Sequence, residues 1–276
     1  MKYKSIFGGL ISVVLLSICI SSCKEQTIKV KSLNYADRFF LVPADTLKGA
    51  LGVSIQVEIP ESYVEQNVLN VIRNTLISNI FGVNYLTVPE DSIPLLYFKQ
   101  LSIEYKNDCE PIVSEFAEKD PLMNFNHEHV LEGFTVLNTP SIYSYGFDRY
   151  VFSGGAHGLN TSNYLNFDLK DGHVINENDL FVAGYETQLI ALLKQGIVEQ
   201  SDLKDLEQSP YWTDSIKPNS NFYISDVGIT YVFNPFEIAP YYVGKTEVTL
   251  FYADIVPLLK QGNPIAYLVN ESKEEE

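Results

Sequence analysis

Cysteine, basic residues and long hydrophobic runs are all scarce in this sequence. Only three of its 276 residues are cysteine, and 19 lysines and arginines stand against 35 aspartates and glutamates, which gives a net charge of −16 at pH 7. This charge disfavours nucleic acids and anionic membrane surfaces as partners, and it fits either a cationic partner or simple solubility. Hydrophobic residues still make up 46% of the chain, so disorder is excluded as its main state.

The longest apolar run stands at the N-terminus and is too short for a comfortable membrane span. Two lysines precede this run, which covers residues 6–20, and this is the order found in secretion signals. The segment Ile20-Ser-Ser-Cys23 that follows resembles the lipobox of bacterial lipoproteins. We therefore predict a signal peptide over residues 1–22 and a lipoprotein acylated, for example with palmitate, at Cys23. The lipid would anchor it in the cell envelope, at the periplasmic face or the cell surface. The alternative is a cytosolic protein with an apolar N-terminal helix and a chance cysteine.

No intrachain disulfide is expected. Cys19 would leave with the signal peptide and Cys23 would be acylated, so Cys109 would be the only free thiol. The hydrophobic core must then stabilise the fold without a covalent link, even in an oxidising compartment.

The hydrophobic pattern predicts an α+β fold of mainly antiparallel sheets, each packed by one or two helices. Alternation of apolar and polar residues predicts strands over residues 52–60, 129–138, 143–153, 160–169, 173–181 and 247–252, and a hairpin over residues 222–233. Helical spacing predicts helices over residues 62–81, 185–200 and 254–260. Ser62 and Glu65 fit a capping box for the first of these. A further helix is expected over residues 98–116, with a break at Pro111.

Three segments resemble one family. The stretch from Tyr150 to His157, with Asn166-Phe-Asp168 downstream, resembles the core of the RsiV-type extracellular domain, a family of unknown function. Residues 233–244 resemble the C-terminal signature of that domain. The strand and helix over residues 53–81 resemble the companion N-terminal domain found in RsiV and in the peptidoglycan deacetylase PdaC.

The resemblance implies two α+β domains and a role at the cell envelope. We expect a tether over residues 23–34, a PdaC/RsiV-like domain over 35–157, an RsiV-type domain over 158–270 and a disordered tail over 271–276. In these relatives RsiV is an anti-sigma factor whose outer domain recognises lysozyme, and PdaC acts on peptidoglycan. This sequence departs from both, because we recognise in it no sigma-binding segment, no transmembrane helix and no deacetylase domain.

The segment Ser153-Gly154-Gly155-Ala156-His157 is the first candidate for a functional site. Paired glycines permit positive φ angles and close backbone approach, which would place His157 at the mouth of a turn, where it could contact a ligand or partner. The alternative is a structural turn whose histidine caps a backbone carbonyl. Ser153 and His157 do not form the Gly-x-Ser-x-Gly elbow of hydrolases, and the sequence marks no acid to orient the histidine. We therefore predict no catalytic residue.

Tyr241 and Tyr242 are the other candidates for partner binding, because aromatic rings stack on sugars and anchor protein partners. Phe233, from the same aromatic cluster, is expected in the core. His127 and His129 would lie on one face of a strand and could bind a metal, but no third ligand is evident. No metal site and no cofactor is therefore predicted.

Together these features predict a lipid-anchored, non-enzymatic binding module of the cell envelope. Its expected partner is a cationic protein, with a lysozyme-like enzyme as the most specific candidate, or a peptidoglycan ligand. The alternatives are a cell-wall glycan hydrolase or deacetylase that uses His157, and a structural envelope subunit, which would expose a large apolar patch.

Overall fold

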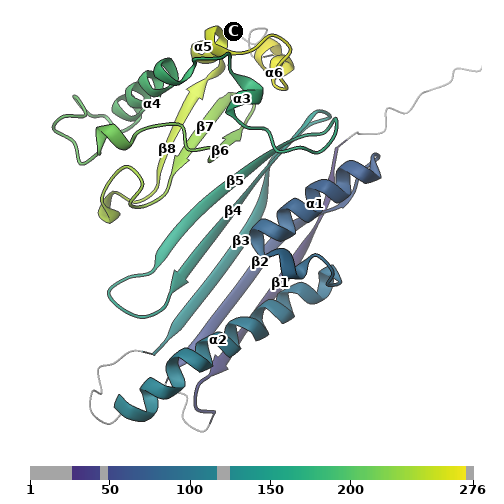
Figure 1. Ribbon diagram of the computed structural model, residues 1–276, viewed down its shortest axis with the longest axis vertical. Coiled ribbons are helices and arrows are strands. Elements are labelled where there is room, and N and C mark those ends of the chain that lie inside the picture. The colour runs from purple at the N-terminus through teal and green to yellow at the C-terminus, as the bar shows by residue number, and fades with distance from the viewer. Residues whose placement is uncertain (1–26, 44–48, 117–124, 272–276) are drawn as a thin grey trace, which may run out of the picture.

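Two β-sheets with helices packed on them make up the structure, a computed structural model that describes residues 27–43, 49–116 and 125–271 (Figure 1). The predicted signal peptide, Cys23 and residues 272–276 fall outside these ranges. The first sheet has the order β1-β2-β3-β4-β5, with strands β1 Lys29–Phe40, β2 Ala50–Ser62, β3 His127–Asn138, β4 Ile142–Phe152 and β5 Leu159–Asp168. The second sheet consists of β6 Phe222–Ile224, β7 Gly228–Phe233 and β8 Thr246–Phe251. The predicted α+β class is confirmed.

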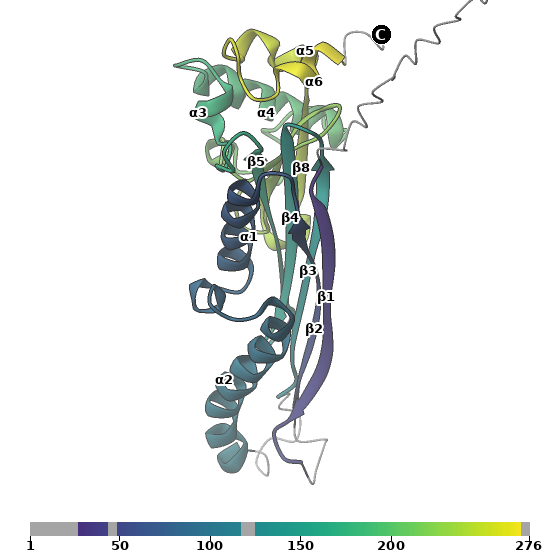
Figure 2. The same ribbon diagram turned by 90° about the vertical axis from the view of Figure 1, so that its right-hand side faces the viewer.

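Helices α1 (Gln66–Ile80) and α2 (Ile93–Phe116) cover one face of the five-stranded sheet (Figure 2). Strand β2 shows why this face is covered, since its alternate residues from Leu51 to Ile59 are buried against the helices. The residues between them, such as Ser54 and Gln56, point to the opposite face and are exposed. All pairings in this sheet are antiparallel except β2 with β3, which run parallel.

Helix α2 runs without a break through Pro111, so the predicted interruption is wrong. Leu101, Tyr105, Cys109 and Val113 recur every fourth residue and are all buried. Packing of this stripe against the sheet holds the helix together across the hydrogen bond that proline cannot donate. Cys109 is a buried free thiol.

The predicted capping box at the start of α1 is also wrong. Ser62 is the last residue of β2, and Glu65 is the N-cap without a side-chain hydrogen bond to the helix. The end of β2 is instead bound by Arg73 of α1, whose guanidinium donates hydrogen bonds to the carbonyl oxygens of Pro60 (2.9 Å) and Glu61 (2.9 Å).

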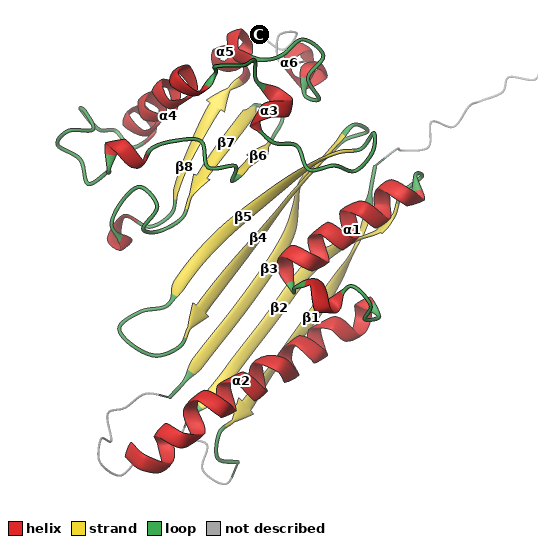
Figure 3. Ribbon diagram, viewed as in Figure 1, coloured by secondary structure: helices red, strands yellow, loops and turns green. Residues whose placement is uncertain are grey.

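Helix α4 (Glu186–Gln200) packs on the three-stranded sheet, with the short helices α3 (Glu177–Leu180), α5 (Tyr252–Ile255) and α6 (Ala266–Glu271) at its end (Figure 3). Residues 173–181, predicted as a strand, contain α3 instead. Asn176 caps this helix by accepting from the Asn178 backbone N–H, and the Asp179 carboxylate accepts from the Asn176 backbone N–H. This reciprocal capping ends the extended segment after a single bridge from Val174 to Phe167.

Asn166 on β5 joins the two sheets. Its side-chain amide donates to the Phe222 carbonyl (2.7 Å), and its Oδ1 accepts from the Ile224 N–H (3.0 Å) and the Ser144 hydroxyl (2.7 Å). The second sheet therefore packs on the face of the first that α1 and α2 leave uncovered, beside β5.

Two of the predicted domain boundaries do not coincide with the boundaries of the strands and the first sheet. Residues 29–34, predicted as tether, form the first half of β1. The boundary predicted at 157/158 lies in the connection between β4 and β5, which pair along their whole length, so it would divide the first sheet. The division into two domains stays a prediction. Within residues 27–43, 49–116 and 125–271, none of the helices is both long and apolar enough to cross a bilayer.

Candidate functional site

The turn between β4 and β5 meets a 3₁₀ turn, Tyr241–Val243, from the second sheet's side of the molecule. The His157 ring stacks on the Tyr241 ring, with centroids 3.7 Å apart and planes 14° from parallel. The Tyr241 hydroxyl donates to the Gly158 carbonyl oxygen at 2.8 Å. Two candidates that the sequence predicts separately are thus in direct contact.

Glycine makes this turn possible. Gly154 and Gly155 have φ angles of 92° and 88°, which side-chain-bearing residues rarely adopt. A Cβ on Gly158 would collide with the ring of Tyr150, so only glycine lets the returning strand pass that close. The turn is therefore shaped by its sequence to present His157, which is exposed.

His157 also contacts backbone, as the structural alternative expects. Its Nδ1 lies 3.1 Å from the Gly158 carbonyl oxygen, and because a carbonyl can only accept, this contact requires the ring proton on Nδ1. Among the described residues, the ring contacts that carbonyl and Tyr241, and neither is a carboxylate. No carboxylate in the described part of the chain is hydrogen-bonded to this ring, whereas a catalytic histidine is commonly oriented by one.

Two aromatic side chains beside the stack face solvent. Tyr242 is 78% exposed and Phe236 is 55% exposed. The Phe236 ring lies 5.5 Å from the Tyr241 ring, and its backbone has a φ of 72°, a strained value for a residue with a side chain. We call His157, Phe236, Tyr241 and Tyr242 the junction patch. Phe233, in contrast, is buried, which confirms its predicted place in the core.

An acidic depression lies next to the junction patch on the open face of the first sheet. Glu132 and Asp148 are direct cross-strand neighbours there, and a space of about 220 Å³ opens between them, Tyr150 and Asn160. The Oδ1 of Asp148 is buried and has no hydrogen-bond partner among the described residues. Like charges placed opposite each other destabilise a sheet, so a cation bound here would relieve their repulsion.

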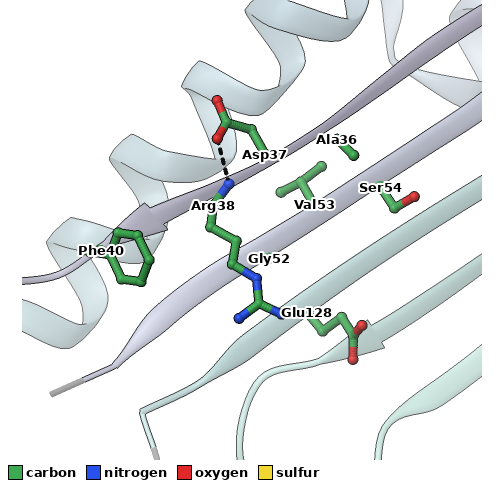
Figure 4. A pocket seen from close by; sticks show the side chains of 8 residues that line it. All are labelled: Ala36, Asp37, Arg38, Phe40, Gly52, Val53, Ser54 and Glu128. Carbon is green, nitrogen blue, oxygen red and sulfur yellow. Dashed lines mark hydrogen bonds between the residues drawn. The ribbon is translucent and has the colours of Figure 1, made fainter. Parts of the chain in front are cut away.

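A larger depression of about 530 Å³ lies further along the same face, over β1, β2 and the start of β3. Figure 4 shows the long Arg38 side chain lying across this surface, with Gly52 below it and Glu128 on the neighbouring strand. Because it is lined by one basic side chain, Arg38, and two acidic ones, Asp37 and Glu128, this depression has no uniform sign of charge.

His127 packs against α2, His129 lies two residues further along β3, and neither is part of the junction patch. His127 Nε2 lies 3.8 Å from the Cys109 sulfur, and its ring centroid is 4.9 Å from that of Tyr105. Burial lowers the pKa of both histidines. In the part of the chain that the structure describes, no group of three or more His, Cys, Asp or Glu side chains is placed to hold a metal.

The sequence predicted the turn and the two tyrosines as candidates. It did not predict that Phe236 is exposed, nor that Glu132 and Asp148 are neighbours. The pair follows from the register of β3 with β4, which a single sequence does not reveal. Phe236 stands in the aromatic cluster that the sequence did mark, yet its exposure depends on the positive φ angle.

Comparison with known proteins places these features in a family context. Residues 178–253, from α3 into α5, match the family described as a protein of unknown function (DUF3298). The anti-sigma-V factor RsiV of Bacillus subtilis (strain 168) is 26% identical over a region covering 53% of this chain and 54% of the relative. This chain therefore spans about half the length of that curated relative.

Two solved structures share the fold. The crystal structure of a DUF3298 family member from Bacteroides fragilis NCTC 9343 has a TM-score of 0.83 at 23% identity, covering 90% of this chain and 100% of that one. A DUF3298 family protein from Pseudomonas aeruginosa PAO1 has a TM-score of 0.56 at 14% identity, with coverages of 86% and 96%. The fold, the matched segment and the similarity to RsiV agree with the resemblance seen in the sequence. These findings support an RsiV-type domain of unknown function in this chain.

Proposed function

We propose that this protein is a non-enzymatic binding module of the cell envelope, anchored by a lipid on Cys23, that recognises a cationic protein through the junction patch and the adjoining residues 153–156. A lysozyme-like enzyme is the most specific candidate. The observation that carries the proposal is the stack of His157 on Tyr241. It joins two segments far apart in sequence and fixes the base of a surface from which Phe236 and Tyr242 project.

Exposed aromatic side chains on a fixed base suit protein recognition. Such residues supply much of the binding energy at protein interfaces, because they bury a large area and lose few rotatable bonds on binding. Strain at Phe236 supports the same conclusion, since a positive φ angle costs of order 1–3 kcal/mol and tends to be kept where it serves a function.

Charge supports a cationic partner. The chain carries a net charge of −16, and the Glu132–Asp148 pair lies beside the junction patch, connected to it along β5 through Asn160. A lysine or arginine of the partner would neutralise the repulsion between the two carboxylates. The Bacillus relative is an anti-sigma factor by name, and such factors act on another protein, which agrees with a binding role.

Calorimetric titration of the purified protein with hen lysozyme, at physiological and at raised salt, tests the proposal. We expect saturable binding that raised salt weakens but does not abolish, because aromatic burial persists when charges are screened. Changing Tyr242→Ala should raise the Kd by about 30-fold, the effect of losing an interface anchor worth about 2 kcal/mol.

The chain offers a matched control for this titration. Phe236 and Phe251 are 55% and 54% exposed, but only Phe236 belongs to the junction patch. Phe236→Ala should weaken lysozyme binding and Phe251→Ala should not. Absence of saturable binding, loss of all binding at raised salt, or equal effects of the two changes would refute recognition through this patch.

The lipid anchor has a separate test. Cells that express the protein should incorporate radiolabelled palmitate into it, and Cys23→Ser should abolish both the label and the recovery of the protein in the membrane fraction. Label retained in the Cys23→Ser variant would contradict acylation at this residue.

A further inference from the structure

A cavity of about 300 Å³ lies between β5 and the loop that leads into β8. Asn160 and Ser162 form its β5 side, and Tyr241, Tyr242 and Lys245 lie across from them. Ligand pockets in proteins run from roughly 300 to 1,000 Å³, so this one has room for a single small molecule. We call it the junction cavity.

The junction cavity contains a buried hydroxyl group without a partner. Ser162 is only 1% exposed, and its buried Oγ makes no hydrogen bond of good geometry with the described residues, although the Tyr164 side chain lies near it. Such a group costs about 1–3 kcal/mol when it is left unpaired. A ligand hydroxyl in the cavity would restore the missing hydrogen bond. The exposed Asn160 amide adds donors and an acceptor at the rim.

Lys245 gives the junction cavity a positive charge in an otherwise acidic chain. Its Nζ lies 2.8 Å from Glu247 Oε1. An ammonium group has three donors, so this ion pair leaves others free for a second anion. A ligand carboxylate would form a charge-assisted hydrogen bond here, which is about twice as strong as a neutral one.

Aromatic and polar groups in one small cavity are the chemistry that recognises a sugar. The Tyr241 hydroxyl is engaged with Gly158 and its ring is stacked on His157, so the largely exposed Tyr242 is the residue that offers the cavity an aromatic face. The C–H face of a pyranose packs on an aromatic ring, while its hydroxyls need partners such as Ser162 and Asn160.

We infer that the junction cavity binds a single pyranose unit that carries a carboxylate. The sugar ring packs against Tyr242, its hydroxyls bond to Ser162 and Asn160, and its carboxylate pairs with Lys245. This inference goes beyond protein recognition by the junction patch, because its polar contacts come from residues that the patch does not contain.

Titration of the purified protein with D-glucuronate and with D-glucose, followed by saturation-transfer NMR and calorimetry, tests the inference. We expect saturable glucuronate binding about tenfold tighter than that of glucose, the difference that one charge-assisted hydrogen bond supplies. Lys245→Gln should weaken glucuronate binding about tenfold and leave glucose binding unchanged. Ser162→Ala should weaken both sugars, with circular dichroism showing that the variant remains folded.

The exposed Lys204 provides the matched control, since Lys204→Gln makes the same charge change away from the cavity. Three results would overturn the inference: no saturable glucuronate binding, equal effects of the two lysine changes, or acetate competing as well as glucuronate, which would mean that only a carboxylate is recognised. The Phe236→Ala variant keeps the two proposals separate, because it should weaken lysozyme binding and spare glucuronate.

Discussion

Replacing Asn166 by alanine should weaken the packing between the two sheets, which Asn221 and Asn234 also bridge through hydrogen bonds to β5. The side chain makes three buried hydrogen bonds, to Ser144, Phe222 and Ile224, and is itself 2% exposed. Each such bond contributes about 0.5–1.5 kcal/mol, and the Phe222 carbonyl and Ile224 N–H would be left buried without partners. We expect Asn166→Ala to lower the free energy of unfolding by about 3–5 kcal/mol.

Equilibrium unfolding in urea measures this loss through two probes. Trp212, the only tryptophan, reports on the part of the chain that holds the second sheet, and far-UV circular dichroism reports on all secondary structure. In the Asn166→Ala variant the fluorescence transition should come at lower urea than the dichroism transition, because the second sheet keeps only part of its attachment to the first.

Two further variants set the scale for Asn166. Ser144→Ala removes one of the three hydrogen bonds and should cost about 1 kcal/mol. Asn160→Ala makes the same change at an exposed position of the same strand and should stay within about 0.5 kcal/mol of the wild type. A loss below about 1 kcal/mol for Asn166→Ala, or a loss equal to that of Asn160→Ala, would refute the role of Asn166 as a link between the sheets.

Two other predictions concern stability. Burial lowers the pKa of His127 and His129, so below pH 6.5 the unfolded chain binds protons that the folded chain does not, and stability should fall as the pH falls through 6.5 towards the folded pKa values. Between pH 8 and 5, the urea midpoint should fall less steeply in the His127→Gln/His129→Gln variant than in the wild type. Equal slopes in the two proteins would contradict the assignment of this pH dependence to the two histidines. Gly196→Ala should destabilise the protein by about 1–2 kcal/mol in urea unfolding, because the new Cβ would lie 2.6 Å from Val248 Cγ1 and this overpacking outweighs the gain in helix propensity. Val248→Ala should remove that clash. The loss of unfolding free energy caused by Val248→Ala should therefore be smaller in the Gly196→Ala variant than in the wild type.

Hydrophobic alternation located most strands because one face of each sheet packs on helices while the other is solvated or polar. The pattern failed where local hydrogen bonding outweighed it. Residues 173–181 alternate like a strand, yet the capping of α3 by Asn176 and Asp179 turns the chain into a helix. The Asn-x-x-Asp spacing resembles a capping box, so this correction was accessible in the sequence. The continuity of α2 through Pro111 was not, because it depends on packing against the sheet.

The candidate site also has parts that the sequence predicts and parts that it does not. Paired glycines before His157 and two adjacent tyrosines are local signals of a special turn and of an aromatic surface, and both could be read from residue types alone. Their contact could not, because it depends on how the second sheet packs on β5. The same holds for Ser162 and Lys245, whose shared cavity is set by tertiary structure.

The parallel pairing of β2 with β3 has a consequence for how the chain folds. Short connections join β1 to β2, and others join β3, β4 and β5. Strands β2 and β3, in contrast, are separated in the chain by α1 and α2, and they pair in the ladder from Leu51–His127 to Val57–Gly133. Closing a loop of roughly 60 residues costs about 3 kcal/mol more entropy than closing a tight turn. Until β3 pairs with β2, the edge of β2 remains unpaired and can bind a strand of another chain. The protein is therefore most prone to aggregate during folding in the interval after β2 forms and before β3 pairs with it.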